Sequence, residues 1–127
     1  MDMQTSFDYA TIRVVPRVEC EEFINVGVVV FCLERRFLEA RVHVDEARVK
    51  ALWPGIDVPA IRRHLGALCA VCAGDTDSGP IAALSQRERF HWVVSPRSTV
   101  IQTSAVHTGL TDDPQTTLEG LMKRIHS

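Results

Sequence analysis

The sequence predicts a single α+β domain, in which two or three helices pack against a mostly antiparallel sheet of about five strands. The chain has 127 residues, the usual size of one domain. Segments of alternating polarity, typical of strands, occupy its first third, and apolar residues at helical spacing follow in the middle and at the end. Hydrophobic residues make up 46% and charged residues 24%, so a packed core is expected.

Three segments in the first third predict strands. Residues 7–17 alternate in polarity and predict a strand that ends near Pro16. Residues 1–6 are expected to be flexible. The next segment, FINVGVVVFCL, is β-branched on both faces in its second half, as in the middle of a sheet. FLEARVHV alternates again and predicts a hairpin with it. Gly27 lowers the strand propensity and indicates a bulge, or a close approach of a ligand or another backbone. Two shorter segments, FHWVV and STVIQTSAV, complete the predicted sheet.

Three other segments predict helices. Asp45 and Asp57 are the expected caps of the first two, because their carboxylates can accept from free N–H groups of the first turn. The second helix has one continuous apolar stripe and ends at Gly74, the residue type that most often closes a helix in the left-handed conformation. The last helix begins at Pro114, whose fixed φ and missing N–H suit the first turn.

Composition and motifs exclude several classes of protein. With 14 basic and 16 acidic residues the net charge is -2, which provides no overall positive field for nucleic acid, so nucleic-acid binding is not expected. The amino terminus has no apolar run of a signal peptide, and no segment is long enough for a membrane span, so a soluble cytoplasmic protein is expected. Phosphate-binding loops, dinucleotide fingerprints and hydrolase elbows do not occur in the sequence. We therefore expect no cofactor, and a non-catalytic role is favoured over an enzyme.

One cysteine pair has the C-x-x-C spacing of metal and redox sites. Cys69 and Cys72 both fall on the apolar stripe in the interior of the second predicted helix. A redox cysteine would lie at a helix amino end, and a zinc site would need two more ligands and a tight turn. Buried structural thiols are therefore favoured over a metal or redox site.

The run SPRSTVIQTSAVHTGLTDDP, residues 95–114, is too polar for an ordinary core strand. In one interpretation its hydroxyls and amides satisfy the backbone of an irregular crossing from strand to helix. In the other, Arg97, Gln102, His107 and Thr108 line a pocket that binds a polar or anionic ligand, because Arg supplies forked donors and imidazole both donates and accepts.

A second polar cluster lies at the start of the second predicted strand, with Glu22 and Asn25, and the first predicted strand carries Arg13. If these strands neighbour the STVIQTS strand, then Arg13, Asn25, Gln102 and His107 share one face of the sheet. The full set of candidate ligand-binding residues is Arg13, Glu22, Asn25, Arg97, Ser98, Gln102, His107 and Thr108.

Three stretches carry a family resemblance: YATIRVVPRVECEEFINVGVVVFC, FHWVVSPRSTVIQTSAVHTGL and TDDP. They resemble an uncharacterised bacterial family, domain-of-unknown-function family 3037, from about Tyr9 to Leu121. The resemblance implies a small stand-alone bacterial protein that works with a HipA-like kinase, as its partner or regulator. By resemblance the signature positions are Arg13, Glu22, Phe23, Asn25, Gly27, Arg97, Ser98, Gln102, His107, Thr108 and Gly109.

Two hypotheses for function follow from these observations. The leading one is a non-catalytic protein-interaction or regulatory module, which an exposed patch containing Trp53 or Trp92 would favour. The alternative is a small-molecule or phosphate-ester site, enzymatic or not, centred on Arg97 and His107, and it requires these side chains to converge in one pocket. An open sheet edge at the first strand would favour a homodimer.

Overall fold

An antiparallel sheet forms the centre of the molecule. The computed structural model describes residues 3–17, 22–97 and 99–125. Its five strands are β1 (Thr5–Arg17), β2 (Glu22–Cys32), β3 (Phe37–Val42), β4 (Ile101–Thr103) and β5 (His107–Thr111). The order is β3-β2-β1-β4, and β5 pairs with the first half of β1. The first strand therefore lies inside the sheet, so the condition under which it would favour a homodimer is not met. The edges are β3 on one side, and β4 with β5 on the other.

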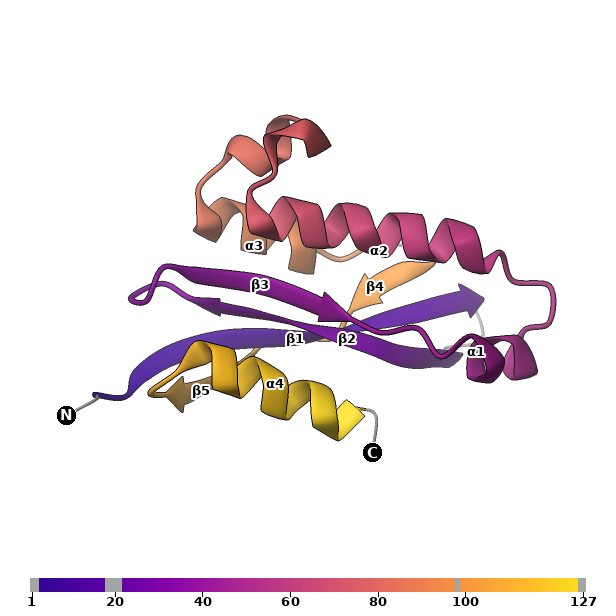
Figure 1. Cartoon of the computed structure of the whole chain (residues 1–127), viewed down its shortest axis with the longest axis horizontal. Coiled ribbons are helices and arrows are strands. Elements are labelled where there is room, and N and C mark those ends of the chain that lie inside the picture. Colours follow the sequence, from indigo (N-terminus) through magenta and orange to yellow (C-terminus); the bar gives the residue numbers. More distant parts are fainter. Residues whose placement is uncertain (1–2, 18–21, 98, 126–127) are drawn as a thin grey trace.

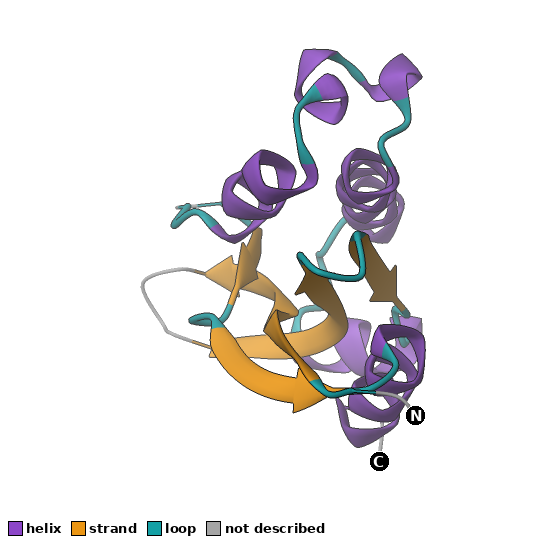
Figure 2. Ribbon diagram, turned by 90° about the vertical axis from the view of Figure 1, so that its left-hand side faces the viewer, coloured by secondary structure: helices purple, strands orange, loops and turns teal. Residues whose placement is uncertain are grey.

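Helices cover both faces of this sheet (Figures 1 and 2). They are α1 (Glu46–Leu52), α2 (Val58–Ala73), α3 (Gln86–Val94) and α4 (Pro114–Ile125), with short 3₁₀ helices at Thr76–Ser78 and Pro80–Ala83 between α2 and α3. The predicted α+β class is confirmed, with one helix more than the two or three expected. No helix in the described ranges is long and apolar enough to cross a membrane.

Each face of the sheet has its own apolar core. Under α2 and α3, residues such as Ile12 and Val29 pack against Leu65 and Phe90. On the other face, Leu118 of α4 packs with Phe7, Val28 and Val30 in a smaller cluster. β2 contributes to both clusters, which explains why its second half has no polar residue.

The predicted helix ends are confirmed where the structure describes them. The Asp57 carboxylate accepts from the N–H of Ala60 at 3.0 Å, and α2 ends at Gly74 with a φ of 76°. Asp113, before Pro114, accepts from the N–H of Gln115 at 3.2 Å. β1 begins at Thr5, within the segment that was expected to be flexible.

The segment FHWVV, predicted as a strand, belongs to helix α3. Ser85 begins this helix, since its hydroxyl oxygen accepts from the N–H of Glu88 at 3.2 Å and it donates to the Glu88 carboxylate at 3.0 Å. Ser85 is therefore the N-cap of α3. Phe90 and Val93 then lie three residues apart on the buried side of the helix. A short apolar run is compatible with either a strand or a helix. The N-cap at Ser85 favours the helix here.

The segment STVIQTSAV, predicted as one strand, is a strand only in its middle. Ile101–Thr103 forms β4, and the sheet resumes only at His107. There His107 and Gly109 pair with Tyr9 and Phe7 of β1.

Gly27 lies beside a bulge, as predicted. Ile12 pairs with Gly27 and Arg13 pairs with Asn25, so β2 has one extra residue, Val26, at this point. Both Val26 and Ile24 consequently face the larger core, and Asn25 faces the opposite side.

Candidate functional site

A row of three polar side chains crosses the sheet on the face that carries α4. Arg13 of β1 pairs with Asn25 of β2 on one side and with Gln102 of β4 on the other. Their neighbours Ile12, Ile24 and Ile101 belong to the core under α2, so strand alternation directs the polar row to the opposite face. The predicted adjacency of Arg13, Asn25 and Gln102 is thereby confirmed.

The polar row retains unused hydrogen-bonding capacity. The Arg13 guanidinium stacks on the Phe23 ring at 3.9 Å, and burial lowers the pKa of Arg13. Neither Arg13 Nε nor Asn25 Oδ1 has a hydrogen-bond partner in the part of the chain that the structure describes, although both atoms are buried. Gln102 Nε2 donates to the carbonyl of Thr99 at 3.0 Å. The row can present a cation and an amide to a polar group that approaches this face.

His107 and Thr108 follow on β5, at the same edge of the sheet. The His107 ring contacts the ring of Tyr9, with centroids 5.3 Å apart. Thr108 points to the other face, where its hydroxyl donates to Asp8 Oδ1 at 2.7 Å. His107 therefore lies on the same face as the polar row, and Thr108 does not.

Arg97 lies on the α2 face, away from His107. Its guanidinium stacks on the Trp92 ring at 4.3 Å and donates to the carbonyl of Trp92, and burial lowers the pKa of Arg97. The predicted convergence of Arg97 and His107 is wrong, because the sheet separates them. Ser98 lies outside the described residues.

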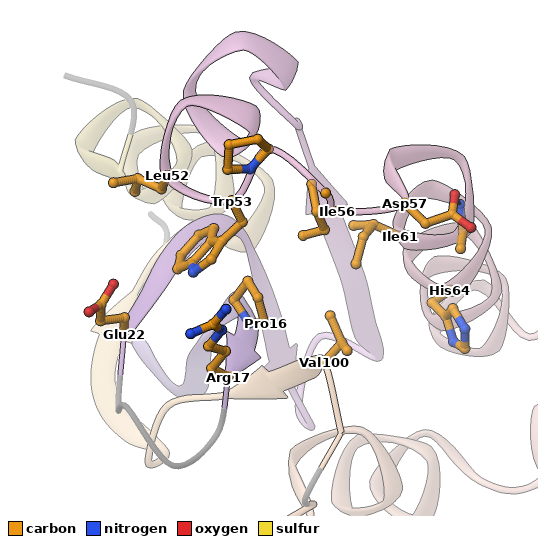
Figure 3. A pocket seen from close by; sticks show the side chains of 13 residues that line it. Pro16, Arg17, Glu22, Leu52, Trp53, Ile56, Asp57, Ile61, His64 and Val100 are labelled. Carbon is orange, nitrogen blue, oxygen red and sulfur yellow. Dashed lines mark hydrogen bonds between the residues drawn. The ribbon is translucent and has the colours of Figure 1, made fainter.

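A hollowed surface lies on this α2 face (Figure 3). It consists of two cavities of about 660 and 480 Å³, and both are lined by His64 and Val100. We call them together the aromatic groove. The first cavity is lined by Pro16, Arg17, Glu22, Leu52, Trp53, Pro54, Gly55, Ile56, Asp57, Ala60, Ile61, His64 and Val100. The second is lined by His64, Ala67, Leu68, Trp92, Arg97, Thr99, Val100 and Ile101.

The walls of the aromatic groove come from segments far apart in the sequence. Trp53 follows α1 and packs partly against the main core, and His64 projects from α2 on the opposite wall (Figure 3). The carboxy end of β1 supplies Arg17, and the start of β2 supplies Glu22. Of the predicted site residues that the structure describes, only Arg97 and Glu22 line this groove.

His64 was not among the predicted site residues. Its spacing was the available signal: His64 follows Ile61 by three residues and precedes Leu68 by four, at the border of the apolar stripe of α2. Nothing in the sequence indicated that Trp53 and Val100 would face it across the groove.

The C-x-x-C pair belongs to the core, as predicted. Cys72 is buried, Cys69 is half-buried, and both are free thiols. Burial, with a smaller effect of Cys69, raises the pKa of Cys72 to about 12. Within the described ranges no group of three or more His, Cys, Asp or Glu side chains is arranged to hold a metal ion.

Cys72 is expected to be unreactive in the folded protein. At neutral pH it should react with iodoacetamide at least about a hundred times more slowly than in the urea-unfolded chain, because the thiolate is the nucleophile. The free energy of unfolding should also fall as the pH rises above about 8.5, since the unfolded chain then loses this proton while the folded chain keeps it. Cys72→Val should make that fall shallower in urea titrations at neutral and alkaline pH. An equally steep fall in this variant would contradict the assignment.

Fold and site together define a small α+β protein with a helix–sheet groove on one face and a polar row on the other. The chain belongs to the family described as Protein of unknown function (DUF3037), whose model matches residues 9–125. This confirms the resemblance seen in the sequence. Comparison with curated proteins and with solved structures gave no match.

Proposed function

We propose that this protein is a non-catalytic interaction module of the bacterial cytoplasm, which binds a segment of a polypeptide partner in the aromatic groove. The observation that carries the proposal is the composition of the groove. Both tryptophans of the chain, Trp53 and Trp92, line it together with Arg17 and Arg97. Trp and Arg are the residue types that contribute most to binding energy at protein interfaces.

The exposed apolar surface of the groove supports the proposal that a partner covers it. The exposed fractions are 38% for Trp92, 40% for Val100 and 55% for Leu52. Burying such area contributes about 25 cal/mol per Å² before the cost of association. Arg97 is already held against Trp92, so a partner would lose less side-chain entropy in ordering it.

The charges of the groove indicate the chemistry of the bound segment. Arg17 and Arg97 are the cations of its walls, and Glu22 and Asp57 are the carboxylates. The Asp57 carboxylate already caps α2 through the N–H of Ala60. The groove therefore suits an apolar segment that carries a carboxylate for Arg97.

A HipA-like kinase is the partner that we propose, on the resemblance of the sequence alone. In this role the module would position or regulate the kinase, with no chemistry of its own. The geometry supports binding in the groove, and the family resemblance supports the identity of the partner.

Binding to the kinase is expected to depend on the tryptophans of the groove. Trp92→Ala should raise the dissociation constant at least about tenfold, because a buried aromatic anchor contributes more than about 1.4 kcal/mol. Trp53→Ala should act in the same direction. The measurement is isothermal titration calorimetry with a purified HipA-like kinase.

Phe23→Ala is the matched control, since Phe23 is an aromatic residue 44% exposed on the polar-row face. It should leave the affinity unchanged. Loss of binding in Phe23→Ala but not in Trp92→Ala would move the binding surface to the polar row. Absence of binding by the unsubstituted chain would overturn the proposed partner.

A further inference from the structure

β5 is an unprotected edge of the sheet. Among the described residues it pairs only with β1. Leu110 is 66% exposed and Val106, just before the strand, is 42% exposed. Residues 106–111 include no charged side chain and no proline. Natural proteins usually protect an edge strand with such residues or with a covering segment, because its free backbone groups can pair with another strand.

The backbone of β5 has free groups on its outer side. Val15 N–H donates to the Val100 carbonyl at 2.7 Å, and Ser104 N–H donates to the Thr11 carbonyl at 2.8 Å. Odd-numbered residues of β1 thus bond toward this edge, and by alternation Phe7 bonds to its partner Gly109. The N–H and C=O groups of Thr108 and Leu110 therefore point away from the sheet.

We propose that two copies of this chain associate through β5, in an antiparallel pair centred on Thr108. In this register Thr108 faces Thr108 of the second copy, and all the outward backbone groups find partners. Leu110 faces Val106 of the second copy on one side of the sheet. On the other side, His107 faces Gly109, where the Phe7 ring occupies the space that a side chain would take. The strand is self-complementary, as a two-fold interface requires.

The arrangement leaves the aromatic groove accessible. β5 pairs with the amino half of β1, Thr5–Tyr9, whereas the groove includes Pro16 and Arg17 at the opposite end of that strand. The two copies would form one continuous sheet with a groove on each. The dimer does not rest on the proposed function, and either can fail alone.

Sedimentation velocity over a concentration series tests the association. The unsubstituted chain should form a dimer, and Leu110→Lys should raise the dimer dissociation constant at least about tenfold, because two ammonium groups would enter the paired face. Leu33→Lys makes the same change at a residue 53% exposed in the β2–β3 turn, and should leave the dimer intact. A monomer at every concentration, or equal effects of both substitutions, would overturn the proposal.

Cross-linking tests the register. Directly opposed residues in a hydrogen-bonded antiparallel pair have Cα atoms about 5.5 Å apart, which a disulfide can span. Thr108→Cys should therefore form a disulfide-linked dimer on mild oxidation, and Leu33→Cys should not. Equal cross-linking of both variants, or of neither, would contradict pairing through β5.

Discussion

Gly27→Ala is expected to lower the free energy of unfolding by about 3 kcal/mol or more. A Cβ atom at Gly27 would lie 2.3 Å from the Arg41 carbonyl oxygen and 2.8 Å from Val42 Cγ1. The first contact is with backbone, so a side-chain rotation cannot relieve it. β3 would have to move away from β2, which would weaken the ladder between them and the core on both faces.

Urea unfolding of Gly27→Ala and Gly66→Ala gives the matched comparison. Gly66 lies on the exposed side of α2, and an added Cβ there would meet nothing within 4 Å. Because alanine is the better helix former, Gly66→Ala should be neutral or stabilise the protein by up to about 1 kcal/mol. Similar unfolding midpoints for the two variants would contradict the close approach at Gly27.

Arg89→Met is expected to destabilise the protein by about 3 kcal/mol, because it removes a buried charged donor that three carbonyl groups share. Arg89 is buried on α3. Its Nη1 donates to the carbonyls of Val71 and Cys72 at 2.9 and 2.7 Å, and its Nε donates to that of Leu84 at 3.0 Å. The guanidinium thus satisfies the carboxy end of α2, where a cation is also favoured by the helix dipole.

Arg87→Met is the control for this substitution. Arg87 lies two residues away on α3 with an exposed side chain. It should change the unfolding free energy by less than about 0.5 kcal/mol. Thermal and urea unfolding of both variants, with far-ultraviolet circular dichroism, would show whether α2 loses its last turn. Equal stability of the two variants would contradict the capping role.

Gly27 and Arg89 stabilise the fold, whereas Arg97 lies in the proposed binding groove. Gly27, a signature position by resemblance, serves the packing of β2 against β3. Arg89 links α2, α3 and the segment between them, and no motif pointed to it. Arg97, another signature position, lines the aromatic groove, where its charge is available to a partner.

Local patterns in the sequence determined most of the fold. The first three strands follow from alternation and β-branching, and α1, α2 and α4 follow from their caps and apolar stripes. These strands and helices are sufficient to define the α+β class. FHWVV was assigned wrongly because its five residues fit either period, and the N-cap at Ser85 was not recognised.

Only the tertiary structure decided where the polar residues act. The sequence placed Arg97 and His107 in one run, yet one stacks on Trp92 under α2 and the other on Tyr9 across the sheet. In contrast, Arg13 and Gln102 are distant in sequence and adjacent in register. Side-chain alternation fixes which residues share a face within one strand, but strand order and bulges depend on how the whole core packs. The sequence by itself therefore determined the elements and their buried sides, and the packing of those elements created the aromatic groove and the open edge at β5.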